Sequence, residues 1–134
     1  MNAHEWLQKA ERALASAHLL LADGDSEGAC NRAYYAMFES AQAALSISGR
    51  MIPDEACRTH NGLITLFSLH LVKPGLIAVE LGRSLNRVQE IRLLADYTGD
   101  AIDLQQAADA VVQAECFVRG MQEYVAKLDR QKSG

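Results

Sequence analysis

The sequence predicts an all-α protein, an antiparallel up-and-down bundle of four long helices plus a short one. Apolar residues recur at steps of three and four residues along almost the whole chain, which is the spacing of one face of an α-helix. The segment that alternates loosely like a strand, 60–72, has no partner strand in an otherwise helical sequence. We therefore expect a helix there as well, and no sheet.

Length and composition predict a single folded unit. The chain has 134 residues, of which 49% are apolar and 2 are proline. A chain of this size can bury a core without disulfides or metals. We expect one domain over residues 1–130 and a frayed tail over 131–134.

The first helix is expected over residues 2–23. Polar residues fall largely opposite a face that carries Trp6, Ala10, Ala13, Ala17 and Leu20. Gly24 stands where glycine commonly ends a helix, and Asp25 or Ser26 can cap the start of the next one.

The second helix, ending near Gly49, carries two adjacent apolar seams. One consists mainly of small residues: Ala29, Ala33, Ala36, Ser40 and Ala44. The other contains larger ones: Tyr34, Phe38, Ala41 and Leu45. Because small residues let backbones approach closely, this pattern is typical of a central helix or of a subunit interface. We expect a homodimer whose interface removes ~1,600 Å² in total.

Turn residues divide the rest of the chain. Residues 50–59 are expected to form a connection in which Pro53 takes a first helical position. The third helix, 60–72, is interrupted by Lys73-Pro74-Gly75, and the fourth ends near Gly99. Asp103 and Gln106 form a capping-box-like start for the last helix, of which residues 132–134 should fray.

Net charge limits the classes of partner. The chain carries 13 basic and 17 acidic residues, a net charge of −4, which argues against a broad nucleic-acid surface. Residues 73–92 nevertheless hold four basic residues against two acidic ones. This strip is either a solvated helix face or a local surface for phosphate.

Several classes of site are not expected. No apolar run approaches the ~18 residues of a membrane span, and no leader opens the chain, so we expect a cytoplasmic protein without membrane contact. The three cysteines lack metal or redox spacing and are expected to be small core residues. The four histidines form no ligand set with nearby carboxylates, and nucleotide-binding loops are missing, so we expect neither a metal nor a cofactor.

Two local constellations carry chemistry. The first is Asn31–Phe38 (Asn-Arg-Ala-Tyr-Tyr-Ala-Met-Phe), where Arg32 is costly to bury unless its guanidinium has a partner. The second is Arg92 with Asp96 and Tyr97. The order of Arg92 and Asp96 is the less favourable one for a pair one turn apart. We therefore expect a buried pair between Arg32 and Asp96, which is either part of a site or a structural ion pair that fixes helix register.

These residues resemble the HEPN family. The resemblance rests on the run from Asn31 to Phe38, on Thr-His-Asn-Gly-Leu-Ile at 59–64 with Phe67, and on Arg-x-x-Ala-Asp-Tyr at 92–97. It extends from about Glu5 to Tyr124. The closest likeness is to small stand-alone prokaryotic HEPN proteins, often encoded beside a minimal nucleotidyltransferase. The resemblance implies a homodimer with a cleft at its axis that binds or cleaves RNA, or binds nucleotides.

One departure from the family pattern bears on activity. HEPN ribonucleases share an Arg-x4–6-His motif, but positions four to eight residues after Arg92 are Asp96 to Asp100, without histidine. We therefore expect a HEPN protein of a toxin–antitoxin-like or nucleotidyltransferase-paired system that binds RNA or nucleotide phosphate. The alternative is a metal-independent endoribonuclease toxin with a rearranged site that uses Arg92 with Asp96 and Tyr97 or with His60.

The expected site residues follow from these hypotheses. Any catalysis is assigned to Arg92, Asp96, Tyr97 and His60, and ligand binding to Arg32, Tyr35, Arg87 and Arg92. His60 is either a source of imidazole from another helix or a hydrogen-bonded structural histidine. The Tyr97 hydroxyl can bond phosphate, stack on a base or, by family analogy, accept a nucleotide from a partner enzyme; the alternative is that Tyr97 closes the core.

Overall fold

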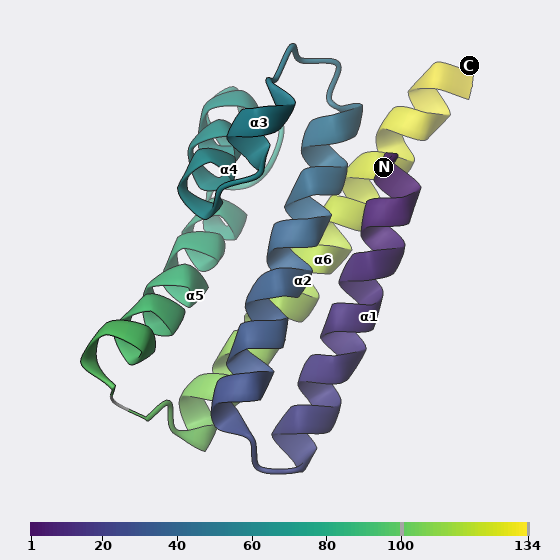
Figure 1. Cartoon of the computed structure of the whole chain (residues 1–134). Coiled ribbons are helices and arrows are strands. Elements are labelled where there is room, and N and C mark those ends of the chain that lie inside the picture. Colours follow the sequence, from purple (N-terminus) through teal and green to yellow (C-terminus); the bar gives the residue numbers. More distant parts are fainter. Residues whose placement is uncertain (100, 134) are drawn as a thin grey trace.

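In the computed structural model, which describes residues 1–99 and 101–133 apart from the side chains of Asp54 and Ser133, the chain is an all-α bundle, as predicted (Figure 1). Four long helices in the described residues run alternately down and up: α1 (Ala3–Ala22), α2 (Ser26–Ile47), α5 (Val79–Thr98) and α6 (Leu104–Ser133). Three shorter elements join α2 to α5: α3 (Asp54–Cys57), α4 (His60–Phe67) and the π-helix η1 (Ser68–Val72).

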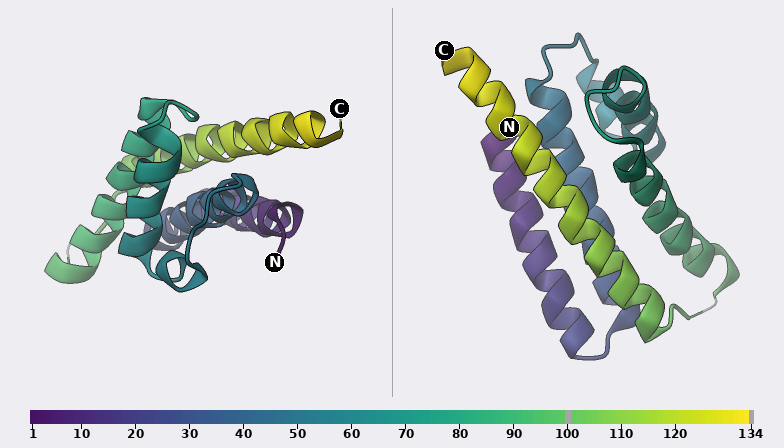
Figure 2. Two further views of the ribbon diagram at one scale, coloured as in Figure 1. Left: turned by 90° about the horizontal axis from the view of Figure 1, so that it is seen from above. Right: turned by 180° about the vertical axis from the view of Figure 1, so that it is seen from behind.

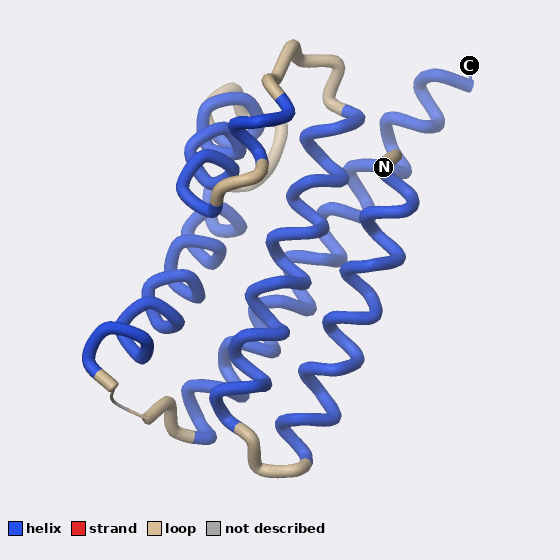
Figure 3. The backbone as a smooth tube through the Cα atoms, in the orientation of Figure 1, coloured by secondary structure: helices blue, strands red, loops and turns tan. Residues whose placement is uncertain are grey.

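Helix α2 lies at the centre of the molecule. Figure 1 shows α1 along one side of α2 and α4 and α5 along the other, and the view from behind in Figure 2 shows α6 crossing α1 and α2. Short loops connect the helices, as the tube in Figure 3 makes plain. A residue on α2 therefore faces α1, α6 or the α4–α5 pair according to its position around the helix.

Side-chain caps set where helices begin. Asp25 accepts a hydrogen bond from the Gly28 backbone and caps α2, one of the two caps expected. The expected reciprocal pair at the start of α6 is also present, between Asp103 and Gln106. Gly99 ends α5 in the left-handed conformation, at a φ of 71° that disfavours a side chain.

Three segments differ from expectation. The connection 50–59 contains the one-turn helix α3, which is too short to give a periodic pattern, and Pro53 is its N-cap rather than its first residue. The helix over 60–72 is present but widens into η1 after Phe67, where the Lys73 N–H donates to the Ser68 carbonyl at 2.8 Å. Helix α6 continues to Ser133, through the segment expected to fray, and Gly134 lies outside the described residues.

The small-residue seam of α2 is used inside the chain. All five of its residues are 0% exposed: Ala29, Ala33, Ala36, Ser40 and Ala44. They face alanines of α1 and the valine and alanine positions of α6, and the missing side-chain volume lets the three helices pack closely. The interpretation of α2 as a central helix is confirmed, and this seam is not available to a second subunit.

Glu39 is an exception in this core. It is 6% exposed, and its Oε2 has no hydrogen-bond partner among the described residues. Burial raises the pKa of its carboxyl above the ordinary value of 4.5, and the charges of Lys9 and Arg32 oppose that shift. Because the folded state disfavours the ionised form, Glu39 lowers stability increasingly as the pH rises above the ordinary pKa.

We predict that Glu39→Met stabilises the protein at pH 7. A buried acceptor without a partner costs about 1–3 kcal/mol of stability, and the substitution removes that cost. The gain should shrink as the pH falls toward the ordinary pKa of 4.5, because Glu39 then becomes protonated in the unfolded as well as in the folded state. Thermal and urea unfolding at several pH values measure it, and Glu123→Met, at an exposed position, is the control. A loss of stability at pH 7 would mean that Glu39 has a partner in the assembled protein.

No helix in the described part of the chain combines the length and the apolar character that crossing a membrane requires.

Candidate functional site

The two constellations of the sequence meet on one tyrosine. Tyr34 of α2 is fully buried, and the Arg92 guanidinium of α5 lies over its ring, 4.7 Å from the centroid. The Tyr34 hydroxyl is 2.8 Å from His60 Nδ1, at the first residue of α4. Three helices thus bring Arg92 and His60 to the same side chain, although 32 positions separate them in the sequence.

Aromatic rings surround this point. Tyr34, Tyr35, Phe38 and His60 form a mutually contacting cluster with ring centroids 5.1–6.4 Å apart. Tyr34 and Phe38 are one helical turn apart, so they project from the same side of α2. The Arg32 guanidinium lies over the Tyr35 ring at 4.8 Å. Each of the two arginines therefore rests on a tyrosine of α2.

Further partners hold Arg92 in place. Its Nε donates to Gln89 Oε1 at 3.2 Å, and its Nη1 is 4.0 Å from Asp96 Oδ2. The Arg92 side chain is 16% exposed, whereas that of Asp96 is 67% exposed. A desolvated cation over an aromatic face is worth about 2 kcal/mol, which offsets part of the cost of burying the charge.

The expected buried pair between Arg32 and Asp96 is wrong. Asp96 is exposed, and its cationic neighbour is Arg92 on its own helix. Arg32 instead finds Tyr35 three residues further along α2. The Tyr35 ring, one turn away, contacts the Arg32 guanidinium, so Arg32 does not require a carboxylate from α5 as its partner.

A cavity of about 420 Å³ opens beside Arg92. The two helices α2 and α5 and the start of the α5–α6 region line it, with Glu27, Gly28, Asn31, Tyr35, Arg92, Ala95, Asp96 and Ile102. Its charged residues are one arginine and two carboxylates, so of the basic strip over 73–92 only Arg92 reaches this cavity. The lining instead places a cation, two acceptors and an aromatic ring around one space.

Four of the predicted site residues do not line this cavity: Arg32, His60, Arg87 and Tyr97. Arg32 and His60 belong to the neighbouring aromatic cluster, whereas Arg87 and Tyr97 lie elsewhere. Arg87 is exposed and its Nη1 donates to Gln113 Oε1 of α6 at 3.3 Å, so it faces away from the cavity. Tyr97 is 85% exposed and does not line the cavity. The alternative that Tyr97 closes the core is wrong.

The electrostatics follow from the burial of this cluster. Burial lowers the pKa of His60, and the nearby Arg92 charge lowers it further, so the ring is neutral at pH 7. Burial raises the pKa of Tyr34 far above its ordinary value, which keeps its hydroxyl protonated. Tyr34 is the hydrogen-bond partner of His60 Nδ1.

Burial also raises the pKa of the Cys30 thiol to about 11. Cys30 and Cys57 are core residues as expected, but Cys116 is exposed, so the expectation is wrong for that residue.

Two residues beside Arg92, Tyr34 and Gln89, are not among the site residues that the sequence predicts. Tyr34 was placed in an apolar seam, and its hydroxyl gives no pattern that reveals a partner 26 residues away. Gln89 stands one turn before Arg92, a spacing at which helical side chains meet. Among the described residues, no group of three or more histidine, cysteine, aspartate or glutamate side chains is arranged to hold a metal ion.

We predict that the pKa of His60 lies below its ordinary value of 6.5 and rises in Arg92→Gln. Removing the positive charge of Arg92 lowers the electrostatic cost of protonating the His60 ring. NMR titration of the histidine ring protons measures the shift. Arg87→Gln, on the same helix but turned to α6, should leave the His60 titration unchanged; equal titrations in the wild type and in Arg92→Gln would contradict the geometry.

Comparison with known proteins places this arrangement in a family. The chain matches the HEPN domain over residues 3–124, which include both constellations and His60. The resemblance seen in the sequence is confirmed.

Three relatives align over most of their length. A UPF0332 protein of Gloeobacter violaceus is 29% identical over 123 residues, covering 90% of this chain and 94% of that protein. A UPF0332 protein of Thermotoga maritima is 31% identical over 127 residues, covering 93% and 92%. A Methanocaldococcus jannaschii protein named "Putative toxin MJ0605" is 34% identical over 112 residues, covering 84% and 80%. The chain belongs to the HEPN domain family.

Proposed function

We propose that this chain is a toxin-like HEPN protein that binds RNA or a nucleotide through a phosphate group at Arg92. The observation that carries the proposal is the placement of Arg92. Its guanidinium is held by Tyr34, Gln89 and Asp96 and still lines an open cavity. A guanidinium fixed before the ligand arrives loses little side-chain entropy on binding phosphate.

The rest of the lining suits the sugar and the base. Asp96 and Glu27 are acceptors for ribose hydroxyl groups, a role that acidic residues take in other nucleotide sites. Tyr35 offers a ring for stacking, and Asn31 an amide that both donates and accepts. One arginine beside two carboxylates favours a ligand with a single phosphate near several hydroxyl groups over a densely charged anion.

The proposal includes partners. Membership in the HEPN family supports a homodimer, and the toxin-named relative supports a toxin–antitoxin-like system. A minimal nucleotidyltransferase is the partner that the resemblance to small stand-alone HEPN proteins implies. Since the small-residue seam is buried within the chain, the dimer interface must use other surfaces. Tyr97, at 85% exposure, is open to nucleotide transfer by such a partner.

We predict that Arg92→Ala weakens binding of a short single-stranded RNA by roughly tenfold or more, the loss expected for one charge-assisted contact of at least ~1.4 kcal/mol. Arg92→Lys should retain only part of the wild-type affinity, because an ammonium group lacks the planar fork of a guanidinium. Fluorescence anisotropy at low and moderate salt measures the affinity.

Arg87→Ala is the matched control, since it removes an arginine of α5 outside the cavity. Sedimentation and thermal unfolding must first show that each variant keeps the oligomeric state and the stability of the wild type. If Arg92→Ala and Arg92→Lys both bind RNA as the wild type does, the phosphate site lies elsewhere.

A second candidate function, metal-independent RNA cleavage, is favoured by one observation. Arg92 and His60 are both held on Tyr34, and His60 is neutral at pH 7 with Nδ1 bonded to that tyrosine. In the tautomer whose Nδ1–H donates to the Tyr34 oxygen, Nε2 can accept the proton of a ribose 2′-hydroxyl, whose oxygen then attacks the adjacent phosphorus. The 5′-oxygen leaves after taking a proton from water, and the imidazolium returns its proton to the hydroxide that remains. Arg92 stabilises the charge that develops on the phosphate.

This second function predicts that His60→Gln abolishes cleavage while RNA affinity changes less than twofold. Electrophoresis of labelled RNA after incubation with chelator measures cleavage, and anisotropy measures affinity. His70→Gln, at another half-buried histidine, is the control. Intact RNA in the wild-type reaction would exclude cleavage and leave the binding function standing.

A further inference from the structure

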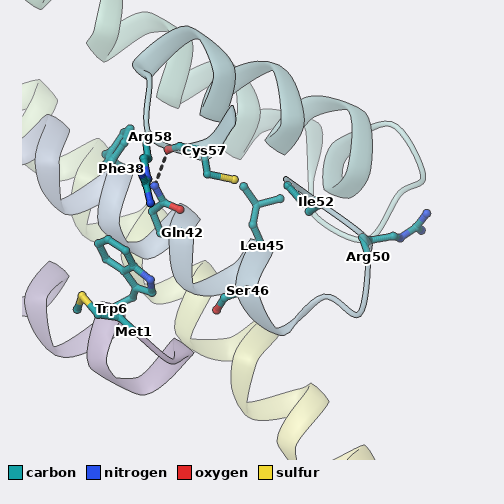
Figure 4. Close-up of a pocket in the computed structure, with 10 residues that line it drawn as sticks. All are labelled: Met1, Trp6, Phe38, Gln42, Leu45, Ser46, Arg50, Ile52, Cys57 and Arg58. Carbon is teal, nitrogen blue, oxygen red and sulfur yellow. Dashed lines mark hydrogen bonds between the residues drawn. The ribbon is translucent and has the colours of Figure 1, made fainter. Parts of the chain in front are cut away.

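We propose that a second cavity, formed by the start of α1, the C-terminal half of α2 and the segment 50–58, binds a nucleotide (Figure 4). Its volume is about 580 Å³, which lies in the range of cavities that hold small ligands. Among the described residues, none lines both this cavity and the one at Arg92. The two sites can therefore be tested separately.

Charge is the first argument for this ligand. The charged residues that line the cavity are Arg50 and Arg58, and no acidic residue of the described chain joins them. The Arg92 cavity, by contrast, contains two carboxylates. In a chain with a net charge of −4, two arginines that have no carboxylate beside them among the described lining residues make a local site for an anion.

The positions of the two arginines assign their roles. Figure 4 shows Arg58 beside Phe38 and Gln42, at the end of the cavity that Trp6 faces from α1. Arg50 lies at the other end, and its guanidinium points outward. Since only Arg58 adjoins the aromatic rings, we assign the phosphate to Arg58 and a weaker, longer-range attraction to Arg50.

The aromatic residues supply the second argument. Trp6 and Phe38 are both half-buried and line the same cavity from different helices. Aromatic rings bind nucleobases by stacking on their faces, whichever base is present. Leu45 and Ile52 add apolar surface between the two ends of the cavity. One cavity therefore contains aromatic rings for the base, Trp6 and Phe38, and a guanidinium for the phosphate, Arg58.

The cavity is also built before any ligand arrives. Gln42 is 9% exposed, and its Nε2 donates to the Cys57 carbonyl at 2.7 Å. This hydrogen bond ties α2 to the residue next to Arg58. It holds the backbone beside Arg58 against α2, so the cavity wall needs little rearrangement on binding.

The sequence contains 1 tryptophan, Trp6, so the tryptophan fluorescence of the protein reports on this cavity. Its fluorescence is measured during titration with AMP, adenosine, inorganic phosphate and a short 5′-phosphorylated RNA, with free tryptophan amide as the correction. We expect saturable quenching by AMP, with adenosine binding more weakly and inorganic phosphate competing with AMP. Tighter binding of the RNA than of AMP identifies RNA as the source of the nucleotide, and equal or weaker binding identifies a free nucleotide.

The variants place the ligand. Arg58→Gln should weaken AMP binding at least tenfold, Arg58→Lys by less, and Arg50→Gln by two- to threefold. All three change exposed side chains, and circular dichroism checks that they fold. Arg92→Gln should leave the Trp6 titration unchanged, which separates this site from the proposed function. Absence of quenching at millimolar AMP, or a wild-type titration in both Arg58 variants, would overturn the proposal.

Discussion

The burial of the Arg92 charge against Tyr34 is the constraint on which the candidate site depends. A guanidinium that is 16% exposed cannot remain there without partners, because desolvating a charge costs several kcal/mol. The ring of Tyr34, the amide of Gln89 and the carboxylate of Asp96 each supply part of the compensation. These same contacts aim Arg92 at the cavity and set the electrostatics felt by His60.

Helix α2 makes this possible by dividing its surface between two tasks. Its alanines face α1 and α6, where the absence of bulky side chains lets the helices approach closely. Its Tyr34 faces α4 and α5, where it holds Arg92 and His60. Because the alanine side of α2 makes the close helix contacts, other sides can carry polar groups. Residues of α2 line both cavities.

Much of the fold could be predicted from the sequence because the apolar periodicity and the helix-capping residues indicate the same helices. Periodic apolar residues, the Asp25 cap and the Asp103–Gln106 pair are all local patterns, and the helices begin where they indicate. The one-turn helix α3 and the π-helix η1 could not be predicted, since neither has a period long enough to recognise. Their geometry depends on how the segment 50–78 closes over α2 and α5.

Of the candidate site, the sequence indicated some of the residues that lie together but few of their contacts. Arg92, His60 and Tyr35 do come together, but the sequence does not say which side chain will satisfy a buried charge. Arg32 was expected to need a carboxylate, and a ring on its own helix serves instead. Tyr34 and Gln89 act through contacts between helices or across one turn, so their roles become visible only when the helices are placed.

The central claim, that RNA phosphate binds at Arg92 beside His60, is tested most directly by NMR of the Arg92 Nε–H and His60 ring signals while a short single-stranded RNA is added. The account predicts that both signals shift along one saturable curve, while the Arg87 Nε–H signal stays in place. Saturable binding that leaves the Arg92 and His60 signals unmoved would contradict it.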